Sequence, residues 1–75
     1  SLDAFTQQQE RMRKQFADRQ MKVDEEVIAY IVPRMERSLS NVKALVGRID
    51  TAAMAERKNL TIPFVKGLIT VKTEE

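Results

Sequence analysis

The side chains best suited to chemistry in this 75-residue chain are three adjacent carboxylates and two serines. The chain contains no His and no Cys, so the commonest general base and the thiolate metal ligands are both missing. Ser38 and Ser40 have no evident base to activate them, and helix capping is the commoner role for such residues. The carboxylates Asp24–Glu26 are contiguous, and neighbours on a helix point in different directions. We therefore expect no catalytic residue, no metal site, and no enzyme activity of the chain on its own.

Phosphate binding has two possible sources in the sequence. A Gly-rich phosphate loop is one, but neither Gly47 nor Gly67 is followed by Lys-Ser or Lys-Thr. The other is the pair Arg34 and Arg37, which share a face if their segment is helical. Guanidinium groups are planar forks of donors that fit phosphate oxygens. The alternative is a solvated face, with partial pairing to acidic neighbours such as Glu36 or Asp50.

Size and composition favour one small soluble helical domain. A chain of 75 residues is near the lower limit for a single core. The net charge of +2 comes without the dense Lys/Arg cluster of a non-specific nucleic-acid binder. No apolar run is long enough to cross a bilayer, and no targeting signal is visible. A cytoplasmic location is the expectation.

Helical periodicity predicts the first two elements. Phe5, Met12 and Phe16 recur at spacings of seven and four, which predicts a helix from about Asp3 to Asp18 within a leading segment of residues 1–20. Asp24 is a plausible N-cap for a second helix, with a buried apolar stripe at residues 27, 28, 31 and 32. That helix is expected to end or kink at Pro33, since proline lacks an amide donor.

Two further helices complete the prediction. The third begins at Ser38 or Ser40 and runs to about Lys58, with Met54 at a core-compatible position. The fourth follows Thr61, which caps it ahead of a proline in the first turn. Residues 70–75 are expected to form a flexible tail. The fold class is therefore all-α, a small bundle of three to four helices joined by short connections.

The strings YIVPRMERS at 30–38 and LTIPFVK at 60–66 carry a resemblance to a known family. Residues 28–69 are similar to the C-terminal lid of the AAA+ replication regulators that include Hda and DnaA. The upstream string FADRQMKVDEEVIAYIV resembles the entry to this lid in proteins of alphaproteobacterial type. The resemblance implies that residues 1–75 are a helical AAA+ lid domain, and that the nucleotide-binding core lies outside this chain.

What the resemblance implies about function concerns the intact parent protein. In the family the lid covers bound ATP or ADP, and its partners are its own core, DnaA and the sliding clamp. The usual nucleotide-sensing arginine aligns with Ser40, so this position departs from the family pattern. Either Arg37, which lies one turn earlier, has taken over the phosphate contact, or the protein senses nucleotide weakly or not at all. The expected cofactor-binding residues are Arg37, Ser40 and Arg34.

Two other functions are open on the sequence. A helix-turn-helix DNA binder would need polar side chains on the fourth helix to contact base edges. Only Lys66 is present there, so sequence-specific DNA binding is not expected. A stand-alone interaction or dimerisation module is the stronger alternative. Its interface would be the apolar stripe of Phe5, Met12 and Phe16, forming a homodimer through exposed apolar surface.

Overall fold

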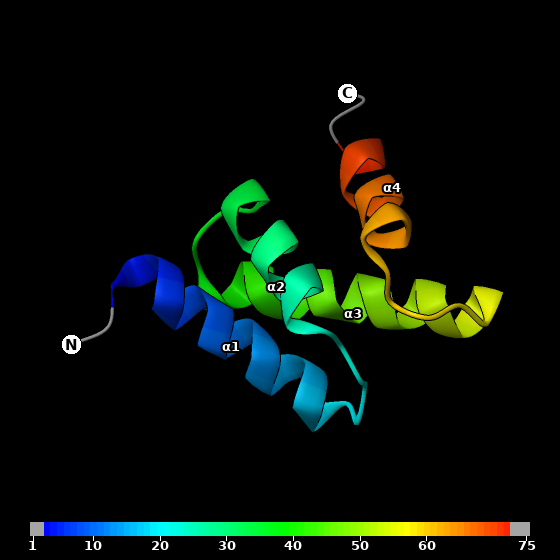
Figure 1. The fold of residues 1–75 in the computed structure, drawn as a ribbon, viewed down its shortest axis with the longest axis horizontal. Helices are drawn as coiled ribbons and strands as arrows, with labels where there is room; N and C mark the ends of the chain where they lie inside the picture. The colour runs from blue at the N-terminus through cyan, green and yellow to red at the C-terminus, as the bar shows by residue number, and fades with distance from the viewer. Residues whose placement is uncertain (1–2, 73–75) are drawn as a thin grey trace.

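The computed structural model describes residues 3–72, and the regular secondary structure of this part of the chain is helical, without a strand. Four α-helices and one short 3₁₀ helix follow one another: α1 (Ala4–Asp18), α2 (Glu25–Ile31), η1 (Val32–Arg34), α3 (Leu39–Glu56) and α4 (Ile62–Lys72). In Figure 1, α2 and α4 lie on the same side of α3. The prediction of an all-α bundle with four helices is confirmed.

Side-chain caps fix where three of the helices begin. The Asp3 carboxylate accepts a hydrogen bond from the Thr6 amide at 2.7 Å. Ser38 does the same for Asn41 at 3.1 Å, and Thr61 for Phe64 at 3.3 Å. Each bond satisfies an amide that has no partner within its helix. Asp24 precedes α2 as predicted, but its side chain makes no capping bond.

Pro33 changes the helix type. α2 ends at Ile31, and the chain tightens into η1, which contains the proline. Proline supplies no amide to the α-helical pattern, so the chain leaves the α-helix there. The predicted end of the second helix is therefore confirmed. Arg37 lies beyond η1 in a non-helical bend, so it does not share a helical face with Arg34.

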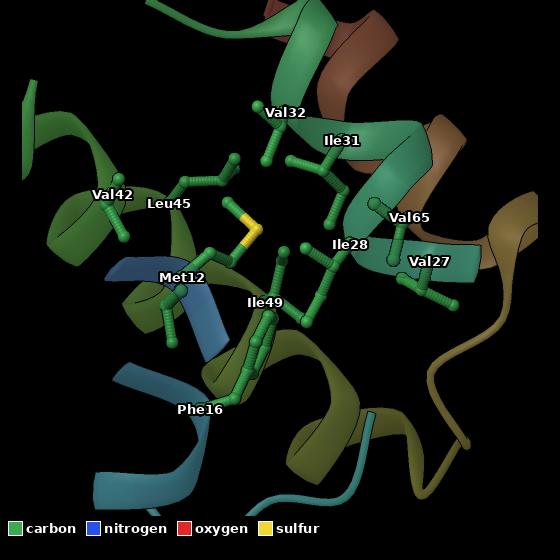
Figure 2. Packing of buried hydrophobic residues seen from close by; sticks show 11 residues of the cluster. Met12, Phe16, Val27, Ile28, Ile31, Val32, Val42, Leu45, Ile49 and Val65 are labelled. Carbon is green, nitrogen blue, oxygen red and sulfur yellow. The ribbon is translucent and has the colours of Figure 1, made fainter. Parts of the chain in front are cut away.

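The hydrophobic core draws on every helix. Met12 and Phe16 of α1 are fully buried, and in Figure 2 the Met12 side chain lies among residues of α2 and α3. The eleven buried members of the cluster are Met12, Phe16, Val27, Ile28, Ile31, Val32, Val42, Leu45, Val46, Ile49 and Val65. Helix α1 packs chiefly against α3, whereas α4 packs against α2. The predicted stripe of the second helix is fully part of this core.

Two side chains and two element boundaries differ from what the sequence indicates. Gln8 is polar, yet it is buried with 1% exposure. Met54 was placed at a core position, yet 72% of it is exposed. The tail was expected from residue 70, but α4 continues to Lys72, and residues 73–75 lie outside the described part. The third helix also ends slightly early, at Glu56 rather than near Lys58.

Candidate functional site

The segment between η1 and α3 carries Arg37, one of the three expected site residues, and it is held from two sides. From α1, the buried Gln8 donates its Nε2 to the Glu36 carbonyl oxygen at 3.3 Å. From α3, Asn41 donates its Nδ2 to the Glu36 carboxylate at 3.0 Å. Glu36 is therefore fixed through both its main chain and its side chain. The sequence analysis missed Gln8, although its spacing of four from Met12 places it on the core-facing side of α1.

Arg37 is exposed beside this anchored residue. It makes no ion pair or hydrogen bond within residues 3–72. Its positive charge is one of the lesser influences that lower the pKa of Asp3, after the hydrogen bonds from Thr6. The guanidinium of Arg37 therefore has its donors available to a ligand.

Ser40 occupies the first turn of α3 and is exposed. Its Oγ lies 3.3 Å from the Oγ of Ser38, the residue that caps the helix. Of the two predicted starting points for the helix, Ser38 is the one found. The hydroxyl of Ser40 does not cap the helix. Ser40 follows Arg37 by three residues, at the point where the connection from η1 enters α3.

Arg34 is separated from the other two. Its Nη1 donates to the Tyr30 carbonyl oxygen at 2.7 Å, and its guanidinium lies 3.9 Å from the centre of the Tyr30 ring. Both contacts fix the guanidinium over Tyr30 of α2, where cation–π attraction adds to the hydrogen bond. The structure thus brings Arg37 and Ser40 into one short segment, while Arg34 lines a neighbouring groove.

The expected pairing of these arginines with Glu36 or Asp50 is not found in residues 3–72. Asn41 donates to the Glu36 carboxylate, and Asp50 forms an ion pair with Arg19 at 2.8 Å. Both acids are therefore engaged by other partners. Neither Arg34 nor Arg37 is therefore neutralised by an ion pair within residues 3–72.

The groove beside Arg34 encloses about 340 Å³ between η1, α3 and α4. Its second cation is Arg48, which the sequence analysis had not singled out as a site residue. The signal was the helical spacing of Asn41, Leu45 and Arg48, which places all three on one face of α3. The groove is lined by Arg34, Met35, Glu36, Asn41, Ala44, Leu45, Arg48 and Ile69.

Metal binding and membrane insertion find no support in the described residues. Residues 3–72 contain no group of three or more Asp, Glu, His or Cys side chains placed to hold a metal ion. Within the same span, no helix combines the length and apolarity needed to cross a membrane.

The interface predicted for a dimerisation module is largely used internally. Met12 and Phe16 have no exposed surface, because both pack into the core of their own chain. Phe5 alone of that stripe is exposed, at 41%. A homodimer formed through this stripe would therefore have only the Phe5 side chain of the stripe available for contact.

The fold and this anchored segment define a small all-α domain of the lid type, with four α-helices and no strand in residues 3–72. The family model for "Hda, lid domain" matches residues 6–69, and the chain belongs to this family. The match includes α1 from residue 6 onward, whereas the resemblance seen in the sequence was carried chiefly by residues 28–69. Comparisons with curated proteins and with solved structures gave no match.

Proposed function

We propose that this chain is the lid of a longer AAA+ protein of the Hda type that regulates the initiation of chromosomal replication. The observation that carries the proposal is the family match over residues 6–69, which spans all four helices through most of α4. On this proposal the nucleotide-binding core, the clamp-binding segment and the catalytic machinery belong to other parts of the parent protein. The lid would then act in the cytoplasm with its own core, DnaA and the sliding clamp, and an alphaproteobacterial origin fits the upstream sequence.

The nucleotide contact is assigned to the segment that leads into α3. Arg37 is exposed and makes no ion pair in residues 3–72, so its guanidinium can bind a phosphate of ATP or ADP. Ser40 follows at the first turn of α3, where a hydroxyl can donate to a phosphate or ribose oxygen. Arg34 has a lesser role, because it lines a groove that neither Arg37 nor Ser40 lines.

The rigidity of this segment supports the assignment. Gln8 and Asn41 both bond Glu36, the residue directly before Arg37. A side chain presented from a fixed backbone loses less conformational freedom when it binds a ligand. Arg37 can therefore report whether nucleotide is present without a large rearrangement of the lid.

The test is nucleotide titration of the intact parent protein carrying Arg37→Ala. Loss of one charge-assisted phosphate contact is expected to weaken ATP or ADP binding about tenfold, equivalent to ~1.4 kcal/mol. Lys43→Ala is the matched control, since it removes an exposed positive charge from α3 outside the Arg37–Ser40 segment. Equal affinities for both variants and the unchanged protein would remove Arg37 from the site.

A further inference from the structure

We propose that the groove between η1, α3 and α4 docks an acidic segment of a partner protein. The partner would place an aliphatic side chain on the groove floor and a carboxylate against Arg34 and Arg48. This interaction surface is separate from the Arg37–Ser40 segment, because neither of those residues lines the groove. The inference therefore does not depend on nucleotide binding.

The groove floor is apolar and comes from three elements. Met35 follows η1, Ala44 and Leu45 belong to α3, and Ile69 belongs to α4. A volume of about 340 Å³ is at the small end of ligand-binding clefts and suits one or two aliphatic side chains. Apolar burial of this kind supplies affinity but little directional specificity.

Specificity comes from two arginines that are already held in place. Arg34 donates one N–H to the Tyr30 carbonyl, and Arg48 donates Nη2 to the Leu68 carbonyl at 3.0 Å. A guanidinium has five N–H donors, so each side chain keeps donors for a carboxylate. Because the internal bonds fix both groups before binding, the entropic cost of ordering them is reduced.

The charge of the groove selects an anion of low charge. Within residues 3–72, neither Arg34 nor Arg48 forms an ion pair. Glu36 is the one acid among the lining residues, and Asn41 bonds its carboxylate. Two guanidinium groups beside one carboxylate leave a single excess positive charge. A peptide with an isolated carboxylate matches that charge, whereas a triphosphate would bring several negative charges against Glu36.

The experiment uses the 75-residue chain, labelled with ¹⁵N, and a short peptide in which a single glutamate is flanked by leucines, blocked at both ends and carrying fluorescein. A matched peptide has lysine in place of glutamate. The amide signals of the residues that line the groove are expected to shift with the acidic peptide. By fluorescence anisotropy the acidic peptide should bind at least about tenfold more tightly than the lysine peptide, and added salt should narrow the difference.

Paired variants locate the binding. Ala44→Glu places a negative charge on the groove floor and is expected to lower the affinity for the acidic peptide at least about tenfold. Ala55→Glu makes the same change on α3 outside the groove and should leave the affinity unchanged. Both positions are exposed, so neither substitution disturbs the core.

Three results would overturn the proposal: equal binding of the two peptides, shifts confined to residues outside the groove, or equal weakening by both variants. ATP as the probe provides a further check. Shifts of the groove residues with ATP but not with the acidic peptide would make the groove a nucleotide site. Shifts that depend on protein concentration without peptide would instead indicate a second copy of the chain.

Discussion

The guanidinium of Arg19 lies 2.8 Å from the Asp50 carboxylate, and Gly47 leaves the space that this arrangement requires. A Cβ at Gly47 would lie 3.2 Å from Nη2 of Arg19. The glycine therefore admits an arginine from the end of α1, rather than the backbone of another helix. This ion pair ties the end of α1 to the middle of α3.

The two glycines should respond differently to substitution by alanine. Gly67 lies in α4 with nothing within 4 Å of a built Cβ, so Gly67→Ala should stabilise the chain by ~0.5–1 kcal/mol. Gly47→Ala has the same helix-propensity gain but displaces Arg19, whose partly exposed ion pair contributes ~0–1 kcal/mol. The net stabilisation by Gly47→Ala, measured by urea denaturation, should therefore be smaller than that by Gly67→Ala.

A double variant separates these two contributions. In an Arg19→Ala background the steric conflict at Gly47 is gone, and Gly47→Ala should then stabilise as much as Gly67→Ala. If the shortfall at Gly47 persists without the arginine, the cause lies elsewhere in α3.

Ile49 marks the centre of the core. Its side chain has no exposed surface, and Figure 2 shows it between Phe16 and Ile28. Ile49→Ala should lower the free energy of unfolding by ~2–5 kcal/mol, which in a chain of this size can prevent folding. Met54→Ala, on the same helix but 72% exposed, should change it by less than ~0.5 kcal/mol. Thermal melts followed by circular dichroism compare the two, and similar melts would show that the core is misplaced.

Arg57 ends α3 in the left-handed conformation, with φ of 54° and ψ of 50°. A residue with a Cβ is strained there, whereas glycine is not. Arg57→Gly should therefore stabilise the chain by about 1 kcal/mol and raise the urea midpoint. Gln20, with φ of 60°, offers an independent repeat through Gln20→Gly. A fall in the midpoint for both variants would show that the arginine and glutamine side chains outweigh the backbone strain.

The ion pair between Arg13 and Glu25 should make stability depend on acid. Arg13 donates two hydrogen bonds to the Glu25 carboxylate, at 2.8 and 2.7 Å, and these lower the pKa of Glu25 from its usual value of 4.5. A pKa lowered by folding stabilises the folded state above the unfolded value, and this contribution is lost as pH falls through the folded value. Near neutral pH, the Glu25→Gln variant should therefore have a lower Tm than the unchanged chain. This difference in Tm should disappear as the pH falls below 4.5.

Glu26→Gln is the control for this pH dependence. Glu26 shares the first turn of α2 but forms no ion pair within the described residues, so both variants lose the same helix-dipole interaction. A gap for Glu25→Gln that stays constant with pH, or one matched by Glu26→Gln, would contradict the role of Arg13.

The helices were predictable because their signals are local. Proline at 33, the caps at Asp3, Ser38 and Thr61, and periodic apolar residues act within a few positions of the sequence. Periodicity gives the angle of a residue around a helix but not how far the neighbouring helices extend. Phe5 has the correct angle yet is 41% exposed near the start of α1.

The candidate site was less predictable, because it depends on contacts between distant residues. Gln8 meets Glu36 across 28 positions, and Arg48 meets Leu68 across 20. Local spacing places Gln8 on the core-facing side of α1, but it does not indicate which distant residue will be its partner. The three expected site residues were thus placed in one segment by their sequence proximity, although Arg34 turns back toward Tyr30. Their contact with nucleotide remains a prediction.

The attachment of α4 has a consequence for the exchange of amide hydrogens. Val65 is the one buried residue among the side chains described for this helix, and Arg48 adds a single bond from α3. Helices α1, α2 and α3 share the remaining ten members of the core with η1. Separation of α4 therefore exposes less apolar surface than global unfolding, and its free energy of opening is lower. The amides of α4 should exchange with solvent while those around Ile49 are still protected, and this difference would make the last helix and the preceding three two separate units of cooperativity.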